Sequence, residues 1–310
     1  MKRIFAIALL CLCTVTCVII SCKGDADKGI TAQEETMTAG AVIIQVDNTV
    51  QPIVEDVLAV FGSVYTNAHI TQVNRNENDI VNALLRDSAR VAVLTRELTE
   101  GEQAHFQKKN IKPVTTHFAS DAVALIASKS ATDSVVNLED VYKVLQGKEA
   151  GAVKQLVFDN ASSSTLRYLL EQAGVKQLPI SGVYSLKSTE EVLKFVQDNT
   201  GSVGVIGVNW LVQPPQELSK YVENIKVLGV DNVKIDKKAK KYYKPSQSNI
   251  ATGFYPLVRK LYLLNYQGKD GLGTGFANYL TAPEGQRIIL KSGLMPVTIP
   301  PREIEVRNEL

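Results

Sequence analysis

Cysteine is absent from the chain after residue 22. All four cysteines, Cys11, Cys13, Cys17 and Cys22, lie in the first segment of the sequence. Because the remainder has no thiol, it can form no internal disulfide bond and no cysteine metal site. Disulfide scaffolds and cysteine-bound zinc domains are therefore excluded as fold classes.

Histidine is also scarce, and its positions do not suggest chemistry. The three histidines, His69, His105 and His117, are scattered without the spacing of metal ligands. The sequence has no G-x-S-x-G elbow and no histidine placed to serve a nucleophilic serine. We therefore predict no enzymatic activity, no bound metal and no cofactor.

The sequence lacks a large excess of charge of either sign. Its net charge is +2, so there is no strong field to attract nucleic acid, and we predict no nucleic-acid partner. Lysines gather only in residues 231–248, where a solvated loop or hairpin is the simpler interpretation and a basic funnel for anions is the alternative. A hydrophobic content of 45% is ample for buried cores, and no internal repeat is visible.

The first 22 residues have the pattern of an export signal. Lys2 and Arg3 precede an apolar run over residues 4–20. The run ends in Ile-Ile-Ser-Cys, which resembles a bacterial lipobox, in which cleavage leaves the cysteine as the lipid-modified first residue. We expect residues 1–22 to be a lipoprotein signal peptide, Cys22 to carry the lipid, and residues 23–40 to form a flexible tether. An uncleaved membrane anchor is the alternative.

Strand and helix patterns alternate after residue 40. Strands are predicted at 41–46, 68–73, 90–94, 112–116, 121–127, 155–158, 201–208 and 252–264, and helices at 53–61, 77–85, 98–109, 137–145, 189–199 and 275–290. This order is typical of βαβ units and a parallel sheet, so the fold class is α/β. Ligands of such sheets bind beyond the carboxyl ends of the strands.

Four hydroxyl residues stand in a row after the strand predicted at 155–158. In the stretch FDNASSSTLRYLL, they are Ser162, Ser163, Ser164 and Thr165. One hydroxyl is enough to cap the helix that follows. A helix N-terminus is also a natural anion site, and the other hydroxyls can complete a shell around a phosphate-like ion. Capping and anion binding both remain open from this stretch alone.

Five motifs resemble one family when they are taken together and in order. The chain is similar to the phosphate-binding lipoproteins of bacterial ABC uptake systems, members of the type II periplasmic-binding-protein superfamily. The resemblance covers most of residues 41–297. It rests on the strand DAVALI at 121–126, the helix LEDVYKVLQG at 138–147, the strand GSVGV at 201–205, the return strand YPLVRKLY at 255–262, and the final helix and turn over 276–296.

The resemblance implies two α/β lobes joined by two hinge crossings, with a ligand in the cleft between them. Lobe one would comprise residues 41–122 and 252–310, and lobe two residues 123–251. The implied function is the capture of phosphate or a similar tetrahedral oxyanion for an ABC permease. The protein would be a monomer held at the cell envelope by its lipid, on the periplasmic face or the cell surface. The alternative is the same fold used for sensing, adhesion or assembly, with altered or no anion binding.

Particular residues match the family's ligand-binding positions. A serine-glycine-threonine turn at a helix N-terminus holds the anion in the family, and Ser162, Ser163 and Ser164 stand at the matching place. Two loops of lobe one would complete the site. They contain Asn48, Thr49, Thr95 and Arg96.

Two departures from the family pattern remove expected features of the anion site. Phe158 stands where the family turn has an arginine, and Ser163 replaces the glycine. A counter-charge must then come from another residue, because a guanidinium suits an oxyanion through two parallel hydrogen bonds. Arg96 is the first candidate and Arg167 the second.

Each of these charged candidates also has a plain structural alternative. Arg96 would otherwise pair with Glu97 or Glu100, and Arg167 would otherwise face solvent from its helix. Asp159 is predicted to accept a hydrogen bond from a protonated anion such as hydrogen phosphate and so to select it. Its alternative is a turn or helix-capping aspartate.

Overall fold

The computed structural model describes residues 35–235 and 241–301, which belong to one compact unit, Glu35–Leu310. The predicted signal peptide, Cys22 and most of the predicted tether lie outside the described residues. Three of the lysines predicted to form a basic loop, Lys237, Lys238 and Lys240, also lie outside them. Among the described residues, no helix is both long and apolar enough to cross a membrane.

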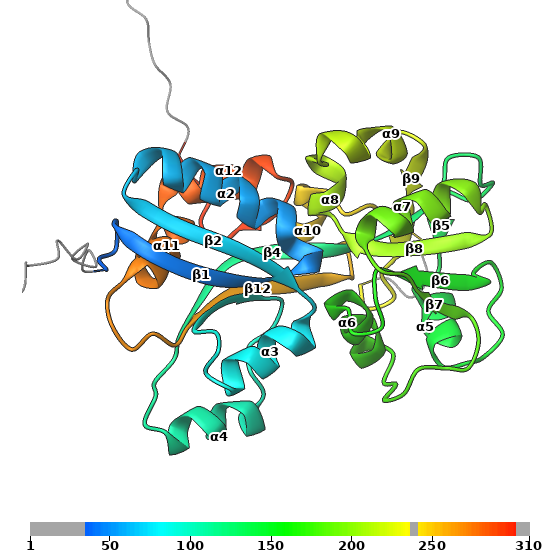
Figure 1. The fold of residues 1–310 in the computed structure, drawn as a ribbon. Helices are drawn as coiled ribbons and strands as arrows, with labels where there is room; N and C mark the ends of the chain where they lie inside the picture. Colours follow the sequence, from blue (N-terminus) through cyan, green and yellow to red (C-terminus); the bar gives the residue numbers. More distant parts are fainter. Residues whose placement is uncertain (1–34, 236–240, 302–310) are drawn as a thin grey trace, which may run out of the picture. The chain divides into compact units, whose positions relative to one another are not determined.

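The first part of the chain forms βαβ units, as the sequence pattern predicts. Its elements are β1 (Gly40–Asp47), η1 (Asn48–Val50), α2 (Gln51–Val64), β2 (Ala68–Arg75), α3 (Glu77–Leu85), β3 (Val91–Leu94) and α4 (Glu100–Lys108). Strand β1 pairs in parallel with β2, which lies beside it in Figure 1, and also with β3. Their carboxyl ends therefore meet at one edge of the sheet, and this is the edge where ligands are expected.

A long central strand then joins two halves of the sheet. Strand β4 spans Val114–Ser128, and β12 (Val258–Asn265) runs antiparallel beside its first half (Figure 1). The second half of β4 pairs with β8 and β9. The sequence predicted two separate extended pieces here, at 112–116 and 121–127, and that division is wrong. The predicted strand 252–264 begins only at Val258.

The part of the chain after β4 forms a second set of α/β units. Its elements are β5 (Val135–Val136), α5 (Leu138–Leu145), β6 (Gln155–Phe158), α6 (Ser164–Gln172), β7 (Val183–Ser185), α7 (Thr189–Asp198), β8 (Ser202–Gly207), α8 (Asn209–Val212), η2 (Gln216–Leu218), α9 (Ser219–Val222), β9 (Ile225–Val227), β10 (Gly229–Asp231), β11 (Tyr242–Tyr243) and α10 (Gln247–Ala251). Strand β6 is parallel to β7 and β8. The carboxyl end of β6 leads directly into the hydroxyl cluster.

The last described elements of the chain pack on the first set of units. After β12 come α11 (Leu272–Thr281), α12 (Pro283–Lys291) and β13 (Met295–Pro296). The single last helix predicted over 275–290 is two helices, because Pro283 begins a new one.

The buried apolar side chains form four clusters. Two of them draw on residues 44–119 and 261–294, and the other two on residues 122–257. Tyr255 and Leu257, which the predicted boundary assigns to lobe one, pack in one of the latter two clusters. Below, lobe one and lobe two denote the predicted ranges, whose boundaries stay a prediction.

Candidate functional site

The loop after β1 contributes Thr49 to the space between the lobes. Asp47 caps this turn, because one of its carboxylate oxygens accepts from both the N–H and the hydroxyl of Thr49, each at 2.8 Å. The Thr49 hydroxyl lies 2.9 Å from the Ser164 hydroxyl of lobe two. Two predicted ligand residues from different lobes are thus in direct contact.

Arg259 is the buried cation of this region, and the sequence analysis missed it. Its guanidinium donates to Asp121 Oδ2 at 3.0 and 2.7 Å, to Ser164 Oγ at 2.9 Å and to Thr49 Oγ1 at 2.9 Å. The side chains of Arg259 and Asp121 are 2% and 0% exposed. We call Asp47, Thr49, Asp121, Ser164 and Arg259 the central network.

A sequence signal for Arg259 existed. The return strand alternates, so that Leu257, Arg259, Leu261 and Leu263 are buried while Lys260 is exposed. An arginine on the apolar face of a strand needs a buried partner, and Asp121 is its direct neighbour on β4.

Burial governs the carboxyl groups of the central network. Burial raises the pKa of Asp121, and the nearby Arg259 only partly offsets this effect. Burial likewise raises the pKa of Asp47. The network therefore contains one guanidinium and two carboxyl groups that are costly to ionise.

Different residues of the hydroxyl cluster cap helix α6 and contact lobe one. Ser163 is the N-cap of α6, since its hydroxyl accepts from the Thr165 N–H and donates to Asp159. Ser164 belongs to the central network. The Ser162 contact that the structure describes is made by its N–H, which donates to the Asn160 side chain. Capping is thus found at Ser163, and Ser164 contacts lobe one, whereas anion binding by this stretch stays a prediction.

Asp159 lies beneath the cap. It is buried and accepts from Ser163 and Asn160. Burial raises the pKa of Asp159 to about 6, because the hydrogen bond from Ser163 offsets only part of the desolvation. A carboxyl group with this pKa can be protonated or ionised near neutral pH.

Thr95, Arg96 and Arg167 meet at one carboxylate, that of Glu77. Glu77 Oε1 lies 2.8 Å from Arg96 Nε and 2.7 Å from Arg167 Nε, and Oε2 lies 3.4 Å from the Thr95 hydroxyl. Arg96 also forms two hydrogen bonds with Glu102, at 2.7 and 3.0 Å. We call these five residues the Glu77 cluster. The salt bridges of Arg96 are thus with Glu77 and Glu102 rather than with the predicted Glu97 or Glu100, and Glu97 contacts Arg96 through its backbone carbonyl. Oxyanion binding by Arg96 stays a prediction.

The Glu77 cluster bridges the lobes, as the central network does. Arg167 comes from lobe two, and it approaches both Glu77 and the Thr95 hydroxyl of lobe one, the latter at 3.3 Å. Arg167 also pairs with Glu171 one turn further along α6. Its side chain is 25% exposed, so it is neither fully buried nor simply facing solvent.

Lobe two also holds the backbone of the β1–α2 loop. The Thr49 carbonyl accepts from the Asn209 side chain at 3.0 Å and from the Trp210 indole at 3.1 Å. A Cβ atom on Gly207 would lie 2.6 Å from this carbonyl. The loop therefore fits against lobe two only because residue 207 is a glycine.

A family model described as PBP superfamily domain matches residues 31–284. The chain belongs to this periplasmic-binding-protein family. The membership confirms the predicted two-lobed fold, and it puts the chain among binding proteins rather than enzymes. None of the curated proteins matches the sequence.

Solved structures share this periplasmic-binding-protein fold at low sequence identity. One is a substrate-binding protein assigned to phosphate ABC transport, from Clostridium perfringens with bound phosphate, at 18% identity and a TM-score of 0.66, covering 84% of this chain and 100% of that one. Another is an ABC-type phosphate transport receptor from Vibrio cholerae, at 18% identity and a TM-score of 0.61, covering 83% and 100%. An OxyR2 regulatory domain from Vibrio vulnificus also matches, at 10% identity and a TM-score of 0.53, covering 79% and 97%. These likenesses show the fold alone.

Two pockets of this periplasmic-binding-protein fold lie beside the interlobe contacts. One, of about 380 Å³, is lined by Asn48 and Gln51 of lobe one and by Asp159, Lys187 and Trp210 of lobe two, among others. The other, of about 210 Å³, has Glu77 and Asn78 on one side and residues of the hydroxyl cluster and α6 on the other. Of the predicted site residues, only Asn48, Asp159, Ser162, Ser163 and Arg167 line these two pockets.

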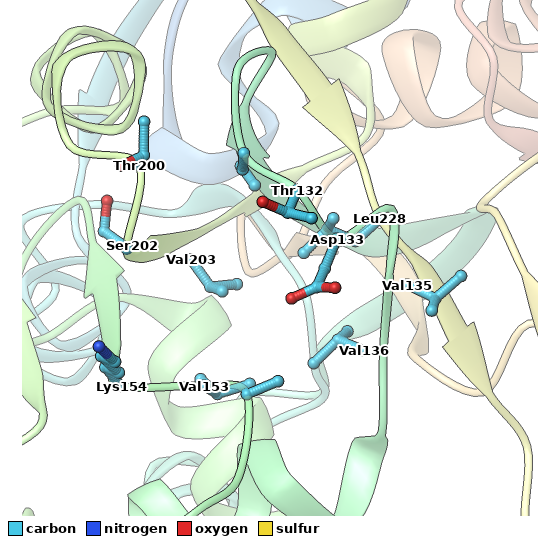
Figure 2. A pocket seen from close by; sticks show the side chains of 14 residues that line it. Thr132, Asp133, Val135, Val136, Val153, Lys154, Thr200, Ser202, Val203 and Leu228 are labelled. Carbon is cyan, nitrogen blue, oxygen red and sulfur yellow. The ribbon is translucent and has the colours of Figure 1, made fainter.

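A third pocket is remote from the predicted site. It has a volume of about 190 Å³ and lies within lobe two, where Asp133 and Lys154 stand among apolar side chains such as Val136 and Val203 (Figure 2). None of the predicted site residues lines it. Among the described residues, no group of three or more histidine or acidic side chains is arranged to hold a metal ion.

Proposed function

We propose that the chain is an extracytoplasmic, lipid-anchored solute-binding protein that captures phosphate or a similar tetrahedral oxyanion between its lobes for an ABC importer. The observation that carries this proposal is the meeting of Thr49, Ser164 and Arg259, two hydroxyls from opposite lobes and one buried guanidinium, at the carboxyl ends of the strands. Donors of this kind suit an oxyanion. The relatives from Clostridium perfringens and Vibrio cholerae are named for phosphate transport, which supports the same ligand.

Binding would use hydrogen bonds and the end of α6, with no chemical step. The N-terminus of this helix carries a partial positive charge, and Ser162 directly precedes its N-cap, Ser163. Asp159, with a pKa of about 6, would accept a hydrogen bond from a protonated anion when its carboxyl group is ionised. Closure would be a hinge motion near residues 121–127 and 250–256.

Isothermal titration of residues 23–310 with phosphate, sulfate and molybdate tests this function. We expect one of the three anions to bind with a stoichiometry of one. No heat with any of them would contradict the proposal.

The lipid anchor is a separate part of the proposal. Cys22 is the only cysteine that remains after the predicted cleavage. We expect the full chain to incorporate a labelled fatty acid in its bacterial host and Cys22→Ala to lose the label. Label that persists in the variant would contradict this assignment.

A second function is favoured by one feature of the central network. Thr49 and Ser164 bind each other at 2.9 Å, and Asp121 already neutralises Arg259. The hydroxyls and the guanidinium of the central network are thus paired with one another across the lobes. This arrangement suits a non-transport envelope lipoprotein, used in sensing, adhesion or assembly, and such a protein would show no anion binding in the titration.

A further inference from the structure

The Glu77 carboxylate contacts residues that the sequence predicts to bind a ligand. The sequence predicts Thr95, Arg96 and Arg167 as oxyanion ligands, and all three approach the Glu77 carboxylate. This carboxylate is 1% exposed. Two guanidinium groups and a hydroxyl around one buried carboxylate are the arrangement expected around a bound oxyanion.

The position of Glu77 in its helix suits a negative charge. Glu77 is the first residue of α3, where the helix dipole favours an anion, and Asn76 caps the helix. Its neighbours in the cluster come from other elements: Thr95 and Arg96 follow β3, and Arg167 lies on α6 of lobe two. The carboxylate therefore contacts residues of both lobes, as the proposed oxyanion would.

Arg167 is not fully satisfied by this contact. Its Nε atom lies 2.7 Å from Glu77 Oε1, yet its N–H finds no aligned hydrogen-bond acceptor although the atom is buried. A buried donor without an acceptor carries a free-energy cost. A free anion in a better position would relieve that cost.

Space for such an anion adjoins the cluster. The pocket of about 210 Å³ is lined by Glu77, Asn78, Ser162, Ser163, Arg167 and Lys176, among others. An anion that entered this pocket would meet Arg167 and the hydroxyl cluster before it met Arg96. Arg96 itself remains held by Glu102 when Glu77 moves away.

We propose that Glu77 is a built-in anion of the cleft, which holds the lobes together without a ligand and which a free oxyanion must displace from Arg167. The competition with a free oxyanion rests on the proposed oxyanion-binding function. The contact by which Glu77 holds the lobes together does not depend on that function. Glu77 is then a determinant of affinity, because its carboxylate competes with the ligand for the same guanidinium. Removing its charge opens the ligand-free protein and strengthens anion binding.

The test uses residues 23–310 with Glu77→Gln and a matched control. Glu100→Gln is the control, since Glu100 also lies in the first turn of a lobe-one helix but is exposed. Titration with inorganic phosphate is expected to give an affinity for Glu77→Gln roughly tenfold or more above wild type, because a charge-assisted competitor is lost. Glu100→Gln is expected to match wild type. An equal or lower affinity for Glu77→Gln, with phosphate bound by wild type, overturns the inference and leaves the proposed function intact.

If no variant binds phosphate, the radius of gyration of the ligand-free protein, measured by small-angle X-ray scattering, provides a second test. A larger radius of gyration for Glu77→Gln than for wild type and Glu100→Gln supports the built-in anion even though the proposed function then fails. An unchanged radius overturns the inference. Arg167→Gln provides a second variant, which removes the lobe-two partner, and it is expected to give the same expansion while it loses phosphate binding.

Discussion

The central network and the Glu77 cluster both join a guanidinium to a buried carboxylate, but they are assembled differently. Arg259 and Asp121 are paired neighbours on β12 and β4, so the register of the sheet fixes their contact. Glu77 and Arg167 come from α3 and α6 in different lobes, so their contact exists only while the lobes are closed. The Arg259–Asp121 contact is therefore present whenever the sheet is folded. The Glu77–Arg167 contact also requires the lobes to be closed.

The two regions also differ in how protonation affects them. Burial raises the pKa values of Asp47 and Asp121 in the central network, so the folded state favours the protonated form of these two groups more than the unfolded chain does. Burial alone would also raise the pKa of Glu102, but hydrogen bonds from Arg96 and Thr99 together lower it. The ionised form of Glu102 is thus stabilised, whereas burial opposes the ionisation of Asp47 and Asp121.

The largest expected effect comes from breaking the pair that the sheet fixes. Asp121→Asn leaves the Arg259 guanidinium buried without its counter-charge, which should cost about 3–5 kcal/mol of unfolding free energy. Arg167→Gln in the Glu77 cluster should cost about 1 kcal/mol or less, because that side chain is partly exposed. Urea unfolding followed by circular dichroism measures both values. Equal losses would contradict the distinction between the two regions.

The next effect is the pH dependence that Asp159 imposes. Its pKa of about 6 in the folded protein lies above its ordinary value of 3.8, so the folded state binds more protons between these pH values. The unfolding free energy should therefore fall as the pH rises from about 4 to 6, by up to about 3 kcal/mol from this group at 1.36 kcal/mol per unit. Asp159→Asn should flatten the profile in that window. A variant profile that is as steep as that of wild type would exclude Asp159 as the source.

A smaller effect is expected from forcing the lobes apart at Gly207. In Gly207→Ala the new Cβ would lie 2.6 Å from the Thr49 carbonyl, and such overpacking should cost about 1–3 kcal/mol or open the cleft. Gly201→Ala is the control, because a Cβ there meets no atom within 4 Å. Thermal unfolding together with small-angle scattering distinguishes destabilisation from opening. Identical behaviour of the two variants would show that the loop does not depend on this close approach.

The smallest effect separates two serines of the hydroxyl cluster. Ser164→Ala removes the hydrogen bonds with Thr49 and Arg259 and should cost about 0.5–1.5 kcal/mol. Ser162→Ala should change stability little, because the contact described for Ser162 is made by its backbone. Urea unfolding compares them, and a larger loss for Ser162→Ala would reverse the assignment.

Local patterns were sufficient to predict much of the fold. The apolar spacing of α2, with Ile53, Val54, Val57 and Phe61 buried, was visible in the sequence, as was the alternation of strands and helices. The length of β4 was not, because His117, Ser120 and Asp121 interrupt its apolar run where it crosses between the lobes. The short elements α8, η2 and α9 were missed as well, since each has only three or four residues.

Site residues could be predicted from the sequence only where a single loop contains a recognisable pattern, such as hydroxyl residues after a strand. Thr49 and Ser164 stand at strand ends, and Ser164 was found from its hydroxyl neighbours. Glu77 was recognised only as the start of a helix, because nothing in its own segment indicates that Arg167 lies 2.7 Å away. A contact between elements that are 90 residues apart depends on how the lobes close, which short patterns do not contain.

The most direct measurement is the distance between the lobes in the absence of ligand. Residues 23–310 contain no cysteine, so spin labels can be attached through Lys108→Cys in lobe one and Glu149→Cys in lobe two, both at exposed positions. Pulsed electron paramagnetic resonance should give one narrow distance for the ligand-free protein, and adding Glu77→Gln should shift it to longer values. A ligand-free distance that is already long, or that Glu77→Gln does not change, would contradict the role of Glu77 as the anion that closes the cleft.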